Sequence, residues 1–269
     1  MLTIDWIKFA EEIKFHNRFF PETYGILRFV DQIFGKKIVT LEKGTKFYRA
    51  RLIGIEDIEE PEEALQGFPK KDSMSPDAKI ATAQRASPAN IPYLYIAEDK
   101  YTALSEIRPG ILSFISLVEI VALKNLNLFD LWIDLSNIND WSDFYQLASR
   151  FSSVISEKEK EIDYLPRQFI AEYIKHKGVD GIRYASFQSQ TGKNIVLFDE
   201  EKVSFIQSEI LQTRNVVYSF LDLNSPDSKS LIGNLEPITL PEDYIECIKE
   251  TVRKIQIPKK KTPSSNVVG

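Results

Sequence analysis

Residues 1–36 carry apolar positions at the spacing of helices. Between Ile4 and Phe20, the positions assigned to one helical face are Ile7, Ala10, Ile13 and Phe20. Pro21 is expected to end this helix, and a second apolar segment from Ile26 to Phe34 ends at Gly35. The pattern therefore predicts a helical N-terminal segment over residues 1–36.

The pattern changes to that of strands after residue 36. Lys37–Leu41 and Lys46–Ile53 alternate in character on either side of a Lys43-Gly44 turn, which predicts a β-hairpin. Residues 54–92 hold an acidic run and two Ser-Pro pairs, which are typical of loops. A loop of this length in a compact domain is usually functional or mobile.

Strands and helices then follow in groups. A short strand, Tyr93–Ala97, precedes Asp99, a favourable N-cap for a helix over Lys100–Ile107 that Pro109 and Gly110 end. Further expected strands are 111–123, 126–131, 181–184, 194–198 and 203–206, and further expected helices are 141–155, 165–177 and 244–255. This grouping predicts an α+β fold with a central domain over 37–206, a C-terminal extension over 207–258 and a flexible tail over 259–269.

Composition narrows the classes of function. The 269 residues are 43% hydrophobic and 27% charged, as in a globular protein that has its own core. The net charge of −5 argues against nucleic-acid binding as the main activity of the chain. The single cysteine, Cys247, excludes an intramolecular disulfide and a cysteine-rich zinc site, and it fits a cytoplasmic location.

The two histidines, His16 and His176, lie in no ligand motif, which disfavours histidine-based metal catalysis and a Ser-His-Asp triad. We expect both histidines and Cys247 to be structural. We also expect neither a leader nor a membrane span. The N-terminal segment is charged, and the most apolar stretch, residues 111–123, is short and contains two serines and a glutamate. Any chemistry then depends on carboxylates, arginines, hydroxyls and aromatic rings.

Two arginines form the first candidate group. Arg49 and Arg51 lie two residues apart on an expected strand, so they share a face on which two guanidinium groups could hold a diphosphate. A solvated strand edge produces the same pattern. The terminal run Lys259–Lys261 is more typical of a solvated tail than of a nucleic-acid site.

A carboxylate and a hydroxyl-rich loop form the second group. Glu106 ends the short helix that follows the strand with Tyr93 and Tyr95, although core tyrosines and a solvated glutamate would explain this pattern equally. Ser186 begins a polar loop that runs to Lys193 and that could hold a phosphate or an amide, but ordinary turn chemistry accounts for it as well.

The order of these segments resembles the RES family, named for its arginine, glutamate and serine. The similarity lies within residues 46–203, in FYRARL, RASPANIPYLYIAEDKYTALSEIRP, DYLPRQFIAEYIKHKGVDGIRYAS and GKNIVLFDEEKV. The family arginine falls on Arg49, the strand tyrosine on Tyr95, the glutamate on Glu106 and the serine on Ser186. Further matches are Arg85, Gln168 and Asn194, and the departures are Gln84, Arg167 and Phe187.

This resemblance implies an ADP-ribosyltransferase-like fold and a toxin that cleaves NAD⁺ by hydrolysis, phosphorolysis or ADP-ribosyl transfer. It assigns Glu106 to the oxocarbenium-like transition state, Arg49 to the pyrophosphate and Tyr95 to stacking near nicotinamide. The other substrate-binding residues that it implies are Ser186, Arg51, Arg85 and Asn194. NAD⁺ is then the substrate, and neither a cofactor nor a metal is expected. The resemblance also implies an antitoxin partner of the Xre type that blocks the cleft.

Three other functions stay open at this point. A mono-ADP-ribosyltransferase would differ only in using a protein side chain as the acceptor. A non-catalytic module would bind NAD without turnover, and a nucleic-acid-binding protein would use the lysine tail. If Glu106 is not the catalytic carboxylate, Glu98 is the next candidate. The sequence selects neither the acceptor nor the oligomeric state.

Overall fold

The structure is a computed structural model that describes residues 5–22, 25–54, 67–133, 142–153, 161–189, 191–214, 216, 219–221 and 230–232. The chain divides into two compact units, Met1–Asn215 and Val216–Gly269. In the second unit, β9 (Ser219–Leu221) pairs antiparallel with β10 (Ser230–Ile232). The helix expected over 244–255 and the tail expected over 259–269 lie outside the described residues.

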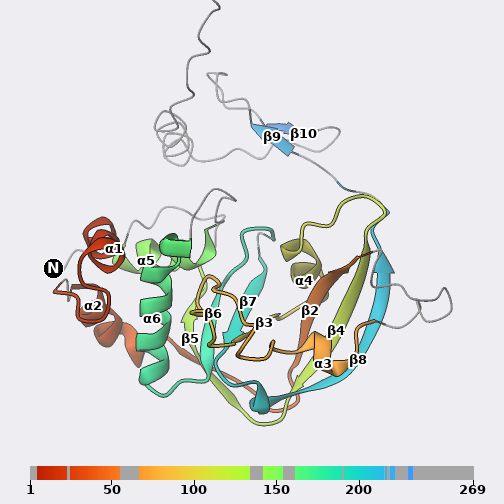
Figure 1. Cartoon of the computed structure of the whole chain (residues 1–269), viewed down its shortest axis with the longest axis horizontal. Helices are drawn as coiled ribbons and strands as arrows, with labels where there is room; N and C mark the ends of the chain where they lie inside the picture. Colours follow the sequence, from red (N-terminus) through yellow and green to blue (C-terminus); the bar gives the residue numbers. More distant parts are fainter. Residues whose placement is uncertain are drawn as a thin grey trace, which may run out of the picture. The chain divides into compact units, whose positions relative to one another are not determined.

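The first unit is built on an eight-stranded mixed sheet with the order β1-β5-β6-β7-β3-β2-β4-β8 (Figure 1). Its strands are β1 (Ile38–Leu41), β2 (Lys46–Ile53), β3 (Leu94–Ala97), β4 (Phe114–Ala122), β5 (Leu126–Leu131), β6 (Gly181–Ala185), β7 (Lys193–Leu197) and β8 (Val203–Gln212). Only the β5–β6 pair among these neighbours is parallel. The helices are α1 (Trp6–Phe15), α2 (Gly25–Phe34), α3 (Lys70–Ser73), α4 (Lys100–Glu106), α5 (Asp143–Ser152) and α6 (Leu165–His176). The predicted α+β class is confirmed.

The sheet consists of two halves that meet at β2 and β3. Only one residue pair, Tyr48 with Ala97, joins these two strands. Side chains from both halves fill one buried cluster, in which Phe47 of β2 and Val118 of β4 pack with residues such as Ile96 and Ile195. The two halves therefore pack face to face around a shared apolar core.

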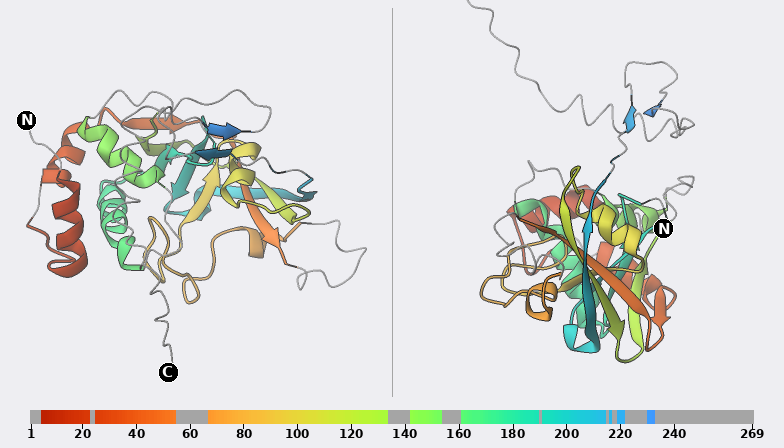
Figure 2. Two further views of the ribbon diagram at one scale, coloured as in Figure 1. Left: turned by 90° about the horizontal axis from the view of Figure 1, so that it is seen from above. Right: turned by 90° about the vertical axis from the view of Figure 1, so that its right-hand side faces the viewer.

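Helices α1, α2, α5 and α6 cover the other face of the half that contains β3, β5, β6 and β7 (Figure 2). The Asp5 carboxylate caps α1 by accepting a 2.9 Å hydrogen bond from the amide of Lys8. The expected apolar face of this segment was partly wrong. Helix α1 buries the face that carries Phe9 and Ile13, so the Ile7 side chain points elsewhere and is 77% exposed. Phe20 lies beyond the end of α1 at Phe15 and is 85% exposed.

The predicted hairpin is also wrong. β1 pairs with β5, whereas β2 pairs with β4 over eight residue pairs from Lys46 to Ile53. A hairpin partner of four residues could not provide as many pairs as β4 does. Gly44, at φ +89°, turns the chain between the two strands.

Strand β8 continues past residue 206, where we expected the central domain to end. It pairs with β4 up to Gln212, and the division between the two units falls after Asn215. The residues from 207 to 212 therefore belong to the central sheet rather than to a separate extension.

Candidate active site

A cavity of about 320 Å³ opens where β2, β3, β6, β7 and α4 come together. Its polar and aromatic lining residues are Tyr48, Arg49, Arg51, Gln84, Tyr95, Glu106, Tyr184 and Asn194. Five of these, Arg49, Arg51, Tyr95, Glu106 and Asn194, are residues that the sequence proposed. The fold thus brings together side chains that lie far apart in the sequence, such as Arg49 and Asn194.

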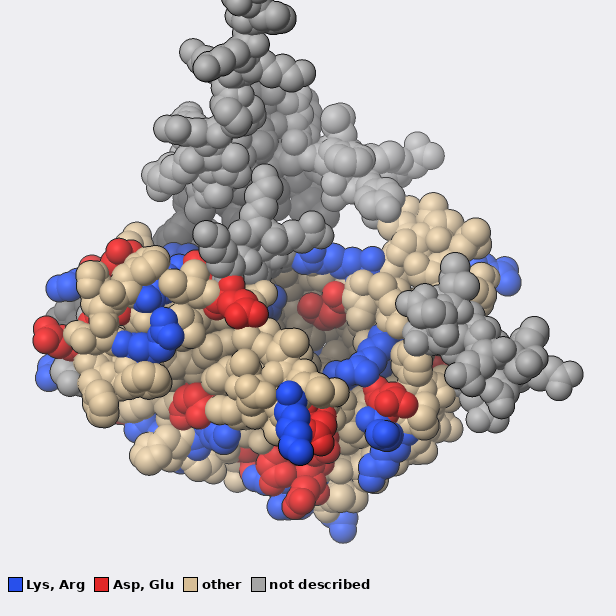
Figure 3. Space-filling view, in the orientation of Figure 1, with Lys and Arg blue, Asp and Glu red and all other residues tan. Residues whose placement is uncertain are grey.

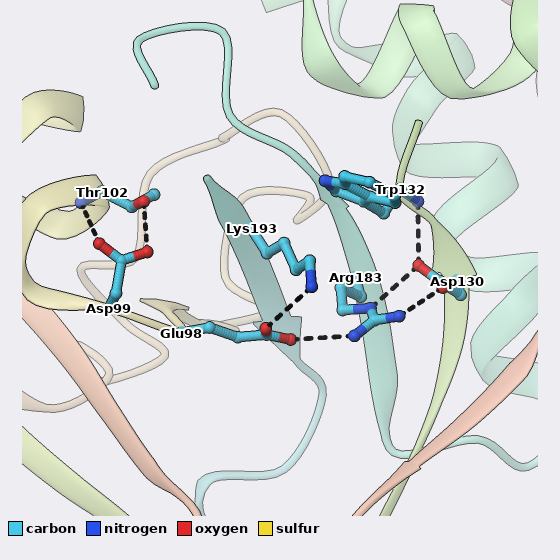
Figure 4. Close-up of polar contacts among 7 residues, drawn as sticks. All are labelled: Glu98, Asp99, Thr102, Asp130, Trp132, Arg183 and Lys193. Carbon is cyan, nitrogen blue, oxygen red and sulfur yellow. Dashed lines mark hydrogen bonds and ion pairs between the residues drawn. The ribbon is translucent and has the colours of Figure 1, made fainter. Parts of the chain in front are cut away.

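Helix α4 follows β3 after a short turn and ends at Glu106, which lines this cavity. Asp99 caps α4, since its Oδ1 atom accepts from the amide of Thr102 at 2.8 Å and its Oδ2 atom accepts from the Thr102 hydroxyl at 2.6 Å (Figure 4). The predicted N-cap is confirmed. The helix buries Thr102 and Ala103 and ends at Glu106, so the cap and this packing fix where the carboxylate emerges.

Two side chains hold the Glu106 carboxylate. Its Oε1 atom accepts from the Ser186 hydroxyl at 2.7 Å and from the Asn194 amide nitrogen at 2.6 Å. The amides of Gln188 and Ser189 each donate to the Ser186 oxygen at 3.1 Å, which orients its hydroxyl towards Glu106. Ser186 is fully buried and stands behind Glu106 rather than on the cavity wall.

Glycine is needed where the Ser186 loop meets α4. A Cβ atom at Gly192 would lie 2.5 Å from the Thr102 hydroxyl and 2.8 Å from the Cβ of Ser189. The amide of Ser186 donates to the carbonyl of Gly192 at 2.9 Å, which closes the loop. The close contact at Gly192 therefore couples the residue that orients Glu106 to the helix that carries Glu106.

Arg49 provides the positive charge of the cavity. Burial, together with the nearby charge of Arg51, lowers the pKa of Arg49 to about 10, so the guanidinium stays charged at neutral pH. Its Nη1 atom is buried and has no hydrogen-bond partner among the described residues. Arg51 is already engaged, since its Nη1 atom donates to the carbonyl of Asp72. Arg49 therefore places a buried guanidinium donor, without a partner among the described residues, at the cavity, where an anion could accept from it.

Tyr95 and Arg85 differ in their relation to the cavity. Tyr95 lines it, while its hydroxyl lies 3.1 Å from both the amide of Ala86 and the Ser87 hydroxyl. Burial raises the pKa of Tyr95. Arg85 is not among the lining residues, because its Nη1 atom donates to the carbonyl of Phe151 at 2.7 Å.

Gln168 supports the cavity from outside. Its side-chain nitrogen donates to the carbonyls of Gln84 and Ser87 at 2.8 and 3.1 Å. Since Gln84 lines the cavity and Ser87 contacts Tyr95, the buried Gln168 fixes the loop that forms one wall.

Sequence reasoning missed Tyr184. This residue pairs with Asn194 across β6 and β7, so both side chains lie on the face of the sheet that carries the cavity. The motif GIRYAS contained the tyrosine, but the face that it occupies depends on the pairing register, which the sequence does not show.

Glu98, the alternative catalytic carboxylate, lies outside the cavity. It pairs with Arg183 at 3.2 Å and Lys193 at 3.7 Å, and Arg183 binds Asp130 through two hydrogen bonds of 3.0 and 2.5 Å (Figure 4). Alternation along β3 and β6 turns Glu98 and Arg183 away from Ala97 and Tyr184. Glu98 is therefore committed to an ionic network on the opposite face.

The remaining candidates lie elsewhere. His16 follows α1 and His176 ends α6, both exposed, and Cys247 lies outside the described residues. A larger hollow beside α1, of about 920 Å³, is lined by eight residues, of which four are acidic: Asp5, Glu11, Glu12 and Glu22. Within the described ranges, no group of three histidine, cysteine or acidic side chains could hold a metal ion.

No helix of the described part is long and apolar enough to cross a bilayer. On the face in Figure 3, basic and acidic side chains are interspersed, so no extended field of one sign covers it.

Comparison with known proteins gives one family match. The model of the RES domain matches residues 65–219. Tyr95, Glu106, Ser186 and Asn194 fall within the match, whereas Arg49 precedes it. Among solved structures, the chain is similar to the crystal structure of the M. tuberculosis MbcT–MbcA toxin–antitoxin complex, with 13% identity and a TM-score of 0.40 over 68% of this chain and 91% of that one. No curated protein matches the sequence.

Proposed function

Since the chain belongs to the RES domain family, we propose that it is an enzyme that cleaves NAD⁺ between nicotinamide and ribose. The observation that carries this proposal is the position of Glu106. Two hydrogen bonds to one oxygen hold its carboxylate in a cavity that also contains a donor of Arg49 with no partner among the described residues. A fixed negative charge and a free guanidinium suit a substrate with a developing cation and a pyrophosphate.

The chemistry needs one carboxylate and no histidine. When the bond between C1′ and the pyridinium nitrogen breaks, its electrons pass to the ring, and nicotinamide leaves as a neutral molecule without protonation. Positive charge develops on the ribose and is stabilised by Glu106. Water then attacks C1′ and loses a proton, which gives ADP-ribose, nicotinamide and H⁺. In phosphorolysis, phosphate replaces water as the nucleophile.

The other residues would bind and orient the substrate. Arg49 would hold a pyrophosphate oxygen through its free donor. Tyr95 would offer its ring to the nicotinamide, since its hydroxyl is occupied by the loop at Ala86. Ser186 and Asn194 would act mainly by fixing Glu106.

We further propose that this activity makes the chain a toxin in the cytoplasm, controlled by an antitoxin that covers the cleft. The family resemblance supports this role, because members of this kind are paired with antitoxins that carry an Xre-type DNA-binding domain. Contact with DNA would then belong to the partner, which fits the net charge of −5 on this chain.

Incubation of the purified chain with NAD⁺ tests the activity. We expect free nicotinamide together with ADP-ribose in plain buffer, or ADP-ribose 1″-phosphate when phosphate is the acceptor. ADP-ribose attached to protein would identify a transferase instead. Binding of NAD⁺ without release of nicotinamide would contradict the proposal. In bacteria that express the soluble chain alone, a fall in cellular NAD⁺ and growth arrest are expected.

A further inference from the structure

Two tyrosines of the cavity differ in what their hydroxyl groups contact. The Tyr95 hydroxyl is shared between the amide of Ala86 and the Ser87 hydroxyl, both at 3.1 Å. Tyr184 is only 6% exposed as a residue, and its hydroxyl makes no hydrogen bond among the residues that the structure describes, although the hydroxyl oxygen is not one of the fully buried atoms that lack a partner. Tyr184 also lines the cavity. The ring of Tyr184 is therefore buried in the wall of the site, while its hydroxyl reaches the cavity and has no partner among the described residues.

The surroundings of Tyr184 fix its ring next to the catalytic carboxylate. Tyr184 pairs in register with Asn194, whose amide donates to Glu106 at 2.6 Å. On its other side, the Arg85 guanidinium lies 5.6 Å from the centre of the ring and is itself bonded to the carbonyl of Phe151. The cation and the strand hold the ring in place, while the hydroxyl remains available.

The hydroxyl of Tyr184 is a donor that the described part of the protein leaves unused at the cavity. Before substrate binds, water can accept from it, and a bound substrate that displaces this water must offer an acceptor in its place. Burial also raises the pKa of Tyr184, which keeps the phenol protonated and able to donate at neutral pH. A substrate oxygen that enters the cavity would supply the missing acceptor.

We propose that Tyr184 contacts the substrate and that its hydroxyl donates a hydrogen bond to a ribose hydroxyl oxygen beside the bond that breaks. Glu106, as a carboxylate, accepts from the ribose, whereas the phenol donates to it, so the two residues together recognise a vicinal diol. This inference rests on the proposed NAD⁺ cleavage. It adds a residue that selects the nucleoside end of the substrate.

Tyr184→Phe is the test, because it removes the hydroxyl and keeps the ring under Arg85. We expect kcat/KM for NAD⁺ to fall about tenfold, as for the loss of one neutral hydrogen bond, with no loss of thermal stability. The matched control is Tyr173→Phe. The hydroxyl of Tyr173 donates to Asp31 at 2.8 Å, outside the cavity, and kinetics like those of the wild type are expected.

Two NAD⁺ analogues, each lacking one hydroxyl of the nicotinamide ribose, locate the contact. One analogue lacks the hydroxyl that accepts from Tyr184. With this analogue, kcat/KM of the wild type and of Tyr184→Phe should differ by less than twofold, since the analogue and the substitution each remove the same hydrogen bond. A tenfold difference with both analogues would overturn the assignment to ribose. An active wild type with equal kinetics in Tyr184→Phe would overturn this inference alone. A wild type that releases no nicotinamide would overturn the proposed function and this inference together.

Discussion

Glu106 is the residue whose charge is expected to matter more than its shape. Glu106→Gln keeps the side-chain volume but removes the negative charge that would stabilise the oxocarbenium-like state. We expect kcat to fall by about two to three orders of magnitude while KM changes only a few-fold, as for the loss of one preorganised electrostatic group. Steady-state release of nicotinamide measures both constants.

A surface glutamate provides the control for this variant. Glu209 forms an exposed ion pair with Lys100 at 2.8 Å, and such pairs contribute little to stability. Glu209→Gln should therefore retain the kinetics of the wild type. If Glu106→Gln instead raises KM and leaves kcat intact, Glu106 binds substrate without stabilising the transition state.

The residues of the site were predictable only in part. Type and spacing were enough to propose Arg49 and Glu106, and the family resemblance added Asn194. All three line the cavity. The sequence could not show that Ser186 and Glu106, 80 positions apart, share a hydrogen bond. It also could not separate Glu98 from Glu106, because the strand face that a residue occupies follows from pairing, and pairing is not local.

At the scale of elements, the contact between α4 and the loop from Ser186 to Gly192 is expected to control activity. Gly192→Ala would place a Cβ atom against the Thr102 hydroxyl, which is buried and bonded to Asp99 and so cannot move freely. Overpacking of this kind typically costs about 1–3 kcal/mol. We expect a lower melting temperature together with a lower kcat, because the loop that carries Ser186 must shift.

Gly110→Ala is the matched control, since its added Cβ atom would meet only the Ser113 hydroxyl, at an ordinary 3.5 Å. Melting temperature and the rate of nicotinamide release are measured for both variants, and only Gly192→Ala is expected to lower them. Unchanged stability and kcat in Gly192→Ala would show that the loop adapts and that its contact with α4 does not set the position of Glu106.

Most helices and strands were predictable, whereas their partners were not. Capping and periodicity located α4, α5 and α6, because these signals act within a few residues. The hairpin between β1 and β2 failed because the partner of β2 lies about 70 residues further along the chain, in β4. The first helix was also shorter than its apolar pattern suggested, so Phe20 is not on its buried face.

At the scale of the whole molecule, the cavity takes residues from both halves of the sheet. Arg49 comes from β2, while Tyr184 and Asn194 come from the half that the helices cover. Since β2 and β3 share a single residue pair, the shape of the cavity depends on the apolar core between the two halves. The sheet that forms this core must therefore be complete for the site to form.

Shortened chains test how much of the sequence the site needs. Residues 1–215 retain all of β8 and every lining residue of the cavity, so we expect this shortened chain to fold and to release nicotinamide within about twofold of the full-length rate. A chain that ends at residue 206 is the matched comparison. It lacks the β8 residues that pair with β4 between Phe114 and Glu119, and it leaves that part of β4 as an unpaired apolar edge. We expect the 206-residue chain to aggregate or to melt at a clearly lower temperature, as measured by circular dichroism and gel filtration. Equal stability and activity in the two chains would mean that the second half of β8 is dispensable, and loss of activity in the 215-residue chain would assign residues 216–269 a direct part in the site.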